Sequence, residues 1–291
     1  MKYSESNIPL VCMQTQSTCY KGTSKMNVLG ILWHSTGANN PKLSRYVQPS
    51  DNASDRSEML AILGVNKNGN DWNHTTTYAG LNAWIGRLAD NSVTSVQTMP
   101  WNFRPWGCAN GTKGSCNDGW IQFEICEDDL SDREYFEAVY REACELTAYL
   151  CKLYGLDPMG SVTHKGVNVP VILCHQDSYK LKLGSNHGDI YHWFSRYGKN
   201  MDDVRQDVAE LMKEEKEVTK EEVQAMIDAS KEKVYHWWKE LPEWAEKPIK
   251  ALYEKGYFAG NSPEDLDLHY STMRTLVVLA RALKADGKLD Y

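Results

Sequence analysis

The sequence predicts an α/β domain with a mixed central sheet flanked by helices, followed by a charged linker helix and a small all-α module. Three observations support this prediction. Apolar strand-like stretches and two amphipathic helices alternate through residues 1–212, which we expect to form the main domain. The composition becomes strongly charged over residues 213–240, and residues 241–291 then carry two short helical patterns.

Four short apolar stretches have the composition of strands, and they are residues 28–34, 92–100, 119–128 and 169–177. The third stretch shows the clearest alternation, because single polar residues separate Ile121, Phe123 and Ile125. Alternation of this kind is typical of a strand with one face in the core. These strands supply the central sheet of the predicted domain.

Two helices are predicted to pack on that sheet. The first begins near Asp132, and its apolar residues recur at steps of three and four to form one stripe. The stripe consists of Phe136, Val139, Tyr140, Ala143, Leu146, Leu150 and Tyr154. Gly155 suits the residue after the last turn, and Pro158 prevents continuation. A second helix over residues 201–213 closes the domain.

The C-terminal part is expected to be helical. Thr219 and Glu222 form a capping-box pattern at the start of a solvated linker helix, and a dimerising coiled coil is the alternative. One further helix ends at Gly256, and Ser271 caps the last one. The last helix has an apolar face of Met273, Leu276, Val277, Ala280 and Leu283. Two helices bury little apolar surface, so wall binding, self-association into a homo-oligomer and packing on the linker all stay open.

Composition and charge exclude several classes of function. The net charge of −7 argues against nucleic acid as a partner, because phosphate binding needs clustered Lys and Arg. No run of about 18 apolar residues is present to span a bilayer, and the N-terminus lacks the segments of a signal peptide. We therefore expect synthesis in the cytoplasm and no membrane insertion.

The eight cysteines form no Cys-x-x-Cys pair, so free thiols are expected in a reducing compartment. A peptidase that uses Cys126 or Cys174 as its nucleophile is one alternative function. Neither cysteine begins a predicted helix, which is a common setting for an activated thiolate.

Three histidines occupy positions that the predicted fold brings together. His34 and His175 each end a strand, and neighbouring strands place them at one edge of the sheet. His187 lies at the start of a predicted helix, capped by Ser185 or Asn186, that returns over this edge. Neutral imidazole is a favoured zinc ligand, and catalytic zinc takes three protein ligands. The alternative is that these histidines are ordinary core residues with backbone partners.

Glu124 is the candidate acid–base residue. It lies in the middle of its strand, with Phe123 and Ile125 on the opposite face. A carboxylate among apolar residues needs a partner, because burying it alone is costly. A zinc site needs a nearby carboxylate that accepts a proton from water. Glu124 would meet that need, and the zinc site would supply the partner that a buried carboxylate needs.

These residues lie within motifs that resemble the zinc-dependent type 2 N-acetylmuramoyl-L-alanine amidases, and most closely the phage and prophage endolysins of clostridia-like bacteria. The motifs span residues 11–212 and read LWHSTGANNP, RYVQP, AGLNAWIG, TMPWN, WGCANGTKGSCNDGWIQFEICED, ILCHQDSYKLKLGSNHGDIYHWF and GKNMDDVRQDV. The resemblance implies a peptidoglycan-recognition-like fold that holds one Zn²⁺. It also implies hydrolysis of the amide between N-acetylmuramic acid and L-alanine in bacterial peptidoglycan.

The resemblance further implies the roles of individual residues. His34 and His175 correspond to the first two zinc ligands of the family, and Glu124 corresponds to its catalytic carboxylate. The third ligand of the family is usually Asp or Cys shortly before a helix and a Trp. This chain reads SNHGDIYHW there, so His187 is the expected third ligand, with Asp189 in reserve.

Two departures from the family bear on the mechanism. Some members carry Lys two positions before the third ligand, where this chain has Ser185 if His187 is that ligand. Many members carry a Trp-His pair where this chain has Trp106 and Gly107. Trp101 and Trp106 are expected to line the substrate groove and stack on sugars, with core packing as the alternative for each.

The resemblance also implies where the protein acts. An endolysin that lacks an export signal acts on the cell wall after release by a membrane-permeabilising partner. A catalytically inactive module that binds peptidoglycan without cleaving it is the alternative function.

Overall fold

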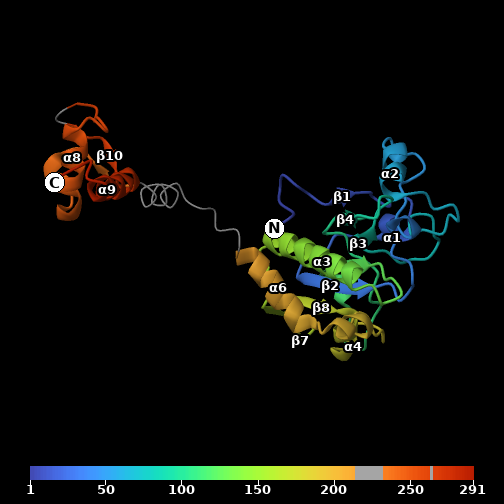
Figure 1. Cartoon of the computed structure of the whole chain (residues 1–291). Coiled ribbons are helices and arrows are strands. Elements are labelled where there is room, and N and C mark those ends of the chain that lie inside the picture. Colours follow the sequence, from blue (N-terminus) through green and yellow to red (C-terminus); the bar gives the residue numbers. More distant parts are fainter. Residues whose placement is uncertain (214–231, 263–264) are drawn as a thin grey trace. The chain divides into compact units, whose positions relative to one another are not determined.

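The predicted mixed sheet with flanking helices is confirmed. The computed structural model describes residues 1–213, 232–262 and 265–291, and it divides into two compact units, Met1–Lys216 and Glu217–Tyr291 (Figure 1). The strands of the first unit are β1 (Leu10–Val11), β2 (Gly30–Ser35), β3 (Ala83–Arg87), β4 (Val93–Gln97), β5 (Trp120–Ile125), β6 (Ser161–His164), β7 (Val167–Pro170) and β8 (Ile172–Cys174). Its helices are α1 (Thr18–Gly22), α2 (Arg56–Leu63), α3 (Arg133–Tyr154), α4 (His175–Lys180), α5 (Tyr191–Phe194) and α6 (Met201–Lys213). Short 3-10 turns are η1 (Leu43–Arg45), η2 (Cys116–Asp118) and η3 (Ser195–Tyr197).

The main sheet has six strands in the order β1-β4-β3-β5-β2-β8. Only β3 and β4 run antiparallel to each other, and the remaining neighbours are parallel. β2 therefore lies between β5 and β8, and all of its residues are buried. Strands β6 and β7 form a separate antiparallel pair.

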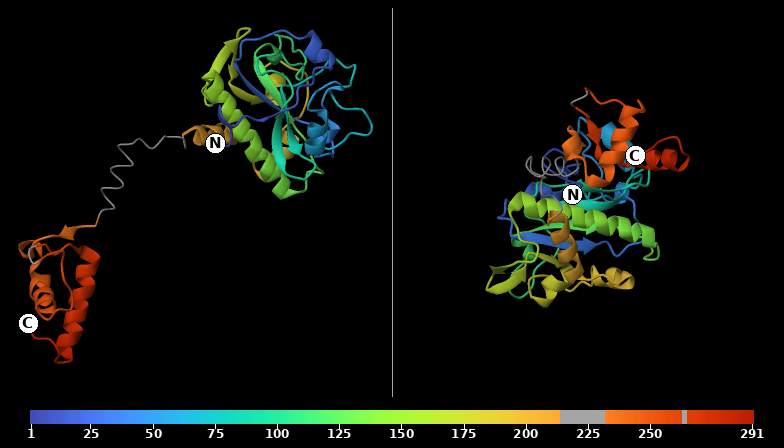
Figure 2. Two further views of the ribbon diagram at one scale, coloured as in Figure 1. Left: turned by 90° about the horizontal axis from the view of Figure 1, so that it is seen from above. Right: turned by 60° about the vertical axis from the view of Figure 1, so that its left-hand side comes forward.

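Helix α3 covers one face of this sheet, and α6 packs beside it (Figures 1 and 2). Trp33 of β2 and Phe123 of β5 lie on the covered face, where their rings pack at a tilt with centroids 5.1 Å apart. The helix begins and ends as predicted: Asp132 accepts a hydrogen bond from the Tyr135 amide, and Gly155 adopts the left-handed conformation after the last turn. The opposite face of the sheet carries the polar residues described below.

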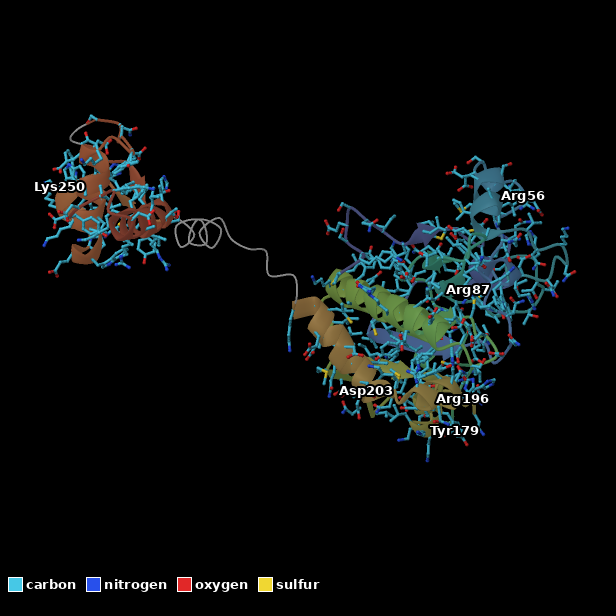
Figure 3. All side chains as sticks on the ribbon, in the orientation of Figure 1. Arg56, Arg87, Tyr179, Arg196, Asp203 and Lys250 are labelled. Atoms are coloured by element: carbon cyan, nitrogen blue, oxygen red, sulfur yellow. The ribbon has the colours of Figure 1, made fainter. Side chains whose placement is uncertain are left out.

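The start of α3 is also tied to the edge of the sheet. Arg87, labelled in Figure 3, lies at the end of β3. Its Nη2 is 3.0 Å from the Asp132 carboxylate. Its guanidinium also lies over the Tyr135 ring, 4.7 Å from the centroid. One side chain thus contacts both the capping residue and the first turn of the helix.

An aromatic cluster connects α3 to the segment that follows the candidate site. The Phe136 ring lies 5.5 Å from Trp193, 5.2 Å from Phe194 and 4.2 Å from Tyr197. These three rings belong to α5 and η3, directly after Asp189 in the chain. The packing of this cluster therefore restrains the position of Asp189.

Two local predictions in this region need correction. His175 does not end a strand, because β8 stops at Cys174 and His175 is the first residue of α4. No helix begins at Ser185, and the next helix starts at Tyr191. The reason is tertiary, since the Ser185 amide donates to the Cys108 carbonyl at 2.8 Å and its hydroxyl contacts His175 instead of capping a helix.

The second unit contains β9 (Val234–Tyr235), η4 (Trp238–Glu240), α8 (Glu243–Glu254), β10 (Leu268–His269) and α9 (Tyr270–Ala285). Its predicted all-α character is corrected by β9 and β10, which pair antiparallel. Most of the predicted linker helix, residues 214–231, lies outside the described residues, and the part from Val234 to Glu240 forms β9 and η4 instead.

The last helix buries the predicted apolar face through Met273, Val277 and Ala280. Ser271 lies inside its first turn rather than at the cap, which is His269. Helix α8 ends at Glu254, slightly before the predicted stop at Gly256. Within the part of the chain that the structure describes, no helix combines the length and apolar character needed to cross a bilayer.

We predict that Phe136→Ala lowers the free energy of unfolding by about 3–5 kcal/mol, because it leaves a cavity among the rings of Tyr140, Trp193, Phe194 and Tyr197. Chemical denaturation followed by tryptophan fluorescence measures this change. Glu137→Ala is the matched control on the exposed face of the same helix, where Glu137 pairs only with Arg133, and it should change stability by less than about 0.5 kcal/mol. Equal effects of the two substitutions would contradict the assigned packing.

Candidate active site

Two neighbouring strands place the first two site residues side by side. In the parallel pairing of β2 with β5, His34 lies directly opposite Glu124. Both side chains are on the face opposite to α3, as the alternation in the sequence predicted for Glu124. Since successive residues of a strand point to opposite faces, Gln122 shares this face with them.

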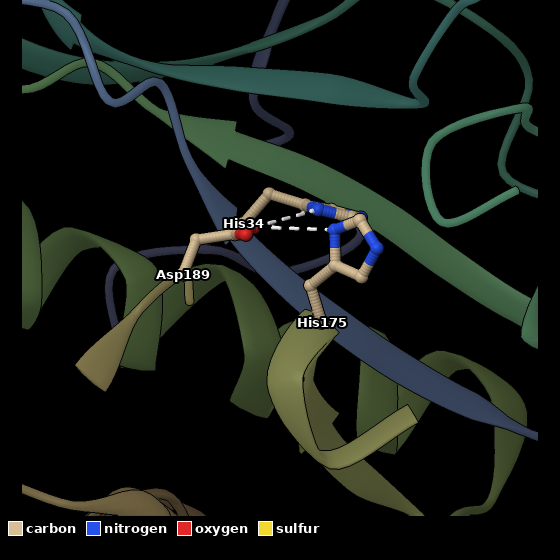
Figure 4. A group of neighbouring side chains, drawn as sticks. All are labelled: His34, His175 and Asp189. Atoms are coloured by element: carbon tan, nitrogen blue, oxygen red, sulfur yellow. Dashed lines mark hydrogen bonds and ion pairs between the residues drawn. The ribbon is translucent and has the colours of Figure 1, made fainter. Parts of the chain in front are cut away.

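The remaining groups arrive from the segments after β8. His175 begins α4, and Asp189 lies in the irregular segment before α5. The Nδ1 atoms of His34 and His175 lie 3.1 Å and 3.4 Å from Oδ2 of Asp189. Figure 4 shows both rings turned toward this carboxylate. All three side chains are buried.

These three side chains suit a single divalent metal ion. Their candidate ligand atoms all lie within 4.8 Å of one another. Tetrahedral zinc at about 2.1 Å from each ligand separates ligand atoms by about 3.4 Å, which is close to the observed nitrogen–oxygen distances. Imidazole and carboxylate are also ligands that zinc accepts. The donor set and its spacing therefore fit the ion that the sequence resemblance implies.

The outer nitrogen of each ring has its own partner. Nε2 of His34 lies 2.8 Å from Oε1 of Gln122, and Nε2 of His175 lies 3.2 Å from Oγ of Ser185. Each Nδ1 is thereby left facing Asp189. Metal-binding histidines commonly donate their second N–H to such a partner, so this arrangement is the one expected around a metal.

The electrostatics favour the ligand form of Asp189 and His175, whereas His34 must lose a proton to bind a metal. Burial opposes ionisation of Asp189, but hydrogen bonds with His175 and His34 outweigh it and hold the Asp189 pKa well below its usual range. Burial lowers the pKa of His175, and the positive charge of His34 acts in the same direction. For His34 burial also acts to lower the pKa, but Asp189 and Glu124 outweigh it and raise the pKa. An anionic carboxylate and a neutral imidazole are what a metal requires of its ligands.

Glu124 is partly buried beside this cluster. Burial raises the pKa of Glu124 to about 8, the nearby His34 lowers it, and Asp189 and Glu127 raise it further. A carboxyl group that can hold or release a proton near neutral pH is suited to general acid–base chemistry.

A cavity of about 170 Å³ opens beside Glu124. Aromatic side chains form much of its wall, and they are Tyr46, Trp72, Trp84 and Trp106. Tyr46 and Trp84 stack with ring centroids 4.8 Å apart. Trp106 lines this cavity, and its predicted role in binding substrate stays a prediction. Trp101 is buried in the main core with 8% of its surface exposed and contributes nothing to this wall.

His187 lies at the edge of the cluster rather than within it. Its ring stacks on His175 with centroids 4.7 Å apart, but 63% of its side chain is exposed. Its Nδ1 lies 4.0 Å from Oδ1 of Asp189. The geometry therefore favours the reserve residue Asp189 over His187 as the third ligand.

The cysteines do not support a thiol nucleophile. Burial raises the pKa of the Cys174 thiol to about 12 and raises that of Cys126 well above its usual value. All eight cysteines are buried and unpaired. An activated thiolate has a lowered pKa, so these residues have the opposite character.

The fold and the site together define an α/β protein with a candidate metal centre on the open face of its sheet. A family model described as N-acetylmuramoyl-L-alanine amidase matches residues 24–189. The chain belongs to this N-acetylmuramoyl-L-alanine amidase family. Membership indicates a hydrolase of the amidase type that acts on peptidoglycan, and it confirms the family resemblance seen in the sequence.

Solved structures of similar fold include the Staphylococcus aureus hydrolase AmiA in complex with its ligand, at 16% identity and a TM-score of 0.45, covering 70% of this chain and 83% of that one. The catalytic domain of XlyA is 13% identical with a TM-score of 0.42, covering 68% and 98%. A mutant endolysin from Bacillus subtilis is 14% identical with a TM-score of 0.40, covering 69% and 99%. No curated protein matches the chain.

Several residues of the site were not predicted from the sequence. Tyr46 and Trp84 stand in the RYVQP and AGLNAWIG motifs, so those motifs already marked the cavity wall. Gln122 precedes Glu124 by two residues, and the period of a strand places both on one face. Trp72 stands in an irregular loop, where the sequence carries no signal for it.

We predict that Glu124→Gln stabilises the metal-free protein at pH 8. A carboxyl whose pKa is raised on folding contributes fully below its unfolded value of about 4.3, and this contribution is lost as pH rises toward 8. Glutamine removes the loss, which we expect to amount to about 1–3 kcal/mol at pH 8 and to shrink toward pH 5. Thermal and urea unfolding in the presence of EDTA measures the difference.

Exposed Glu137→Gln is the control for this experiment, and it should show no pH-dependent gain. If Glu124→Gln were no more stable than wild type at pH 8, folding would not raise the pKa of Glu124.

Proposed function

We propose that this protein is a zinc-dependent N-acetylmuramoyl-L-alanine amidase of the endolysin type. It cleaves the amide between the lactyl group of N-acetylmuramic acid and L-alanine in peptidoglycan. The single observation that carries the proposal is the convergence of two Nδ1 atoms on the Asp189 carboxylate, next to Glu124, in a chain of the amidase family. We propose residues 1–212 as the catalytic domain and residues 241–291 as a separate module for wall binding or self-association.

His34, His175 and Asp189 are the residues that would hold the zinc. When bound, zinc supplies a Lewis acid that polarises the scissile carbonyl and makes water more acidic. Asp189 contributes negative charge to the site, and the two imidazoles contribute neutral nitrogen donors. This support comes from the donor set and its spacing, described above.

Glu124 acts as the acid–base residue. It accepts a proton from the attacking water and delivers it to the nitrogen of the departing L-alanine, so that the peptide leaves as an amine. Two observations support this role: Glu124 lies opposite His34 in the strand pair, and it lines the cavity.

The cavity and His187 position the substrate. The aromatic wall that includes Trp106 and Trp84 offers apolar faces against which sugar rings and the lactyl group pack. With Asp189 as third ligand, His187 occupies the position two residues earlier, where some family members carry Lys. Its exposed imidazole, next to the cluster, is placed to donate a hydrogen bond to the oxygen that gains charge in the reaction.

We predict that Glu124→Gln lowers the rate of muropeptide cleavage by about 10²–10⁴-fold, because glutamine cannot transfer a proton. Zinc content should stay at one ion per chain, since Glu124 is no ligand. Mass spectrometry of digested peptidoglycan measures the rate through new N-terminal alanine, and elemental analysis gives the zinc content.

His34→Ala should remove both the zinc and the activity. Cleavage that survives EDTA and His34→Ala would refute the zinc mechanism. Tight binding of peptidoglycan fragments without any cleavage by the zinc-loaded wild type would instead identify a recognition module.

We predict that Asp189→Ala weakens zinc binding by at least about 100-fold, because it removes a ligand and leaves two imidazoles. His187→Ala should weaken it by less than about 10-fold, since this side chain lies outside the cluster. Competition against a chromophoric chelator measures both constants. The reverse order of the two effects would restore His187 as the third ligand.

A further inference from the structure

We propose that Gln122 is a positioning residue that determines which nitrogen of His34 binds the metal, and that Gly107 provides the space for its side chain. The inference rests on the proposed function, because it concerns the same zinc site. Many family members carry His where this chain has Gly107, and the inference gives this difference a role in this chain.

The orientation of the Gln122 amide can be traced back to the backbone. The amide N–H groups of Gly107 and Cys108 both donate to Oδ1 of Asn117, each at 3.2 Å. Nδ2 of Asn117 donates to the Ala109 carbonyl at 3.0 Å. Three backbone groups thus fix which end of the Asn117 amide is the oxygen. The Asn117 oxygen therefore faces its next neighbour, Gln122, as an acceptor.

The same logic then fixes His34. Nε2 of Gln122 donates to the Asn117 oxygen at 2.8 Å, so Oε1 of Gln122 must face the imidazole, 2.8 Å from Nε2 of His34. Because this oxygen can only accept, Nε2 of His34 carries the hydrogen. Nδ1 carries the second hydrogen while the ring is protonated and bonded to Asp189. When the ring becomes neutral, as a metal ligand must be, the lone pair is on Nδ1. Gln122 and Asn117 are fully buried, so water does not compete for these bonds.

Gly107 leaves room for this contact. A Cβ at position 107 would lie 2.4 Å from Oε1 of Gln122, 2.4 Å from Cδ2 of Leu81 and 3.1 Å from Nε2 of His34. The backbone of Gly107 is outside the left-handed region, so conformation alone does not require glycine there. The requirement is for space beside the amide oxygen.

The same segment also orients the second histidine. The hydroxyl of Ser185 donates to the Cys108 carbonyl at 3.4 Å and is left to accept from Nε2 of His175 at 3.2 Å. Residues 107–117 therefore contact Gln122, which bonds to His34, and Ser185, which bonds to His175. This loop sets the orientation of both imidazoles before any metal is bound.

We predict that Gln122→Leu and Gly107→Ala each weaken zinc binding by about 10–100-fold. Leucine keeps the size of the side chain but removes the acceptor, whereas alanine at 107 displaces the acceptor and keeps its chemistry. Gln97→Leu is the matched control, because Gln97 is a buried glutamine of the same sheet whose amide donates to the Met99 carbonyl, away from the site. It should lower stability without changing zinc affinity by more than about twofold.

Three measurements are needed on the full-length proteins. Competition against a chromophoric chelator gives the zinc affinity, and thermal unfolding in EDTA shows that the metal-free protein is folded. Long-range ¹H–¹⁵N NMR of the zinc-loaded protein identifies the nitrogen of His34 that binds the metal. We expect Nδ1 in wild type and in Gln97→Leu, and loss of this single state in Gln122→Leu.

The outcomes separate this inference from the proposed function. Unchanged zinc affinity in Gln122→Leu, or zinc on Nε2 of His34 in wild type, would overturn the positioning role while leaving the metal site intact. If Gln122→Leu does not fold, Gly107→Ala decides the question by the same criteria. If His34→Ala bound zinc as tightly as the wild type does, the proposed function itself would be refuted.

Discussion

The parallel pairing of β2 with β5 is the constraint on which the rest of the site depends. It sets His34 opposite Glu124, so the proposed ligand and the proposed acid–base residue lie together without help from any loop. A shift of one residue in either strand would turn its side chain into the apolar layer under α3. β8 lies on the other side of β2 and delivers His175 to the same edge. The sheet therefore positions three groups, and loops need to supply only Asp189.

The two faces of the sheet have different tasks. The face under α3 is a dry layer of aromatic and aliphatic side chains, including Trp33 and Phe123, and it supplies much of the stability. The opposite face buries amides, imidazoles and carboxylates that are costly unless they are paired. The network from Asn117 through Gln122 to His34 supplies those pairs. The raised pKa of Glu124 shows that burial of its charge still lowers stability. Proteins commonly give up stability in this way at functional sites.

Features set by local pattern could be predicted from the sequence. Helix α3 runs between the predicted Asp132 cap and Gly155, because a continuous apolar stripe and two end signals agree. The face of Glu124 followed from the period of a strand. The choice between His187 and Asp189 could not be made in this way. The two residues are two positions apart in a segment without regular structure, and its path is set by contacts with Cys108 and the aromatic cluster at Phe136. Strand β9 was not predicted either, because it depends on pairing with β10, which lies far away in the sequence.

The eight sealed thiols have a consequence for where such a molecule can work. None of them is cross-linked, and all are shielded from water, so the fold owes nothing to an oxidising step. Small extracellular domains often depend on such cross-links. The unit that holds all eight cysteines instead reaches its folded form without disulfide formation, and burial keeps these thiols away from oxidants in the solvent.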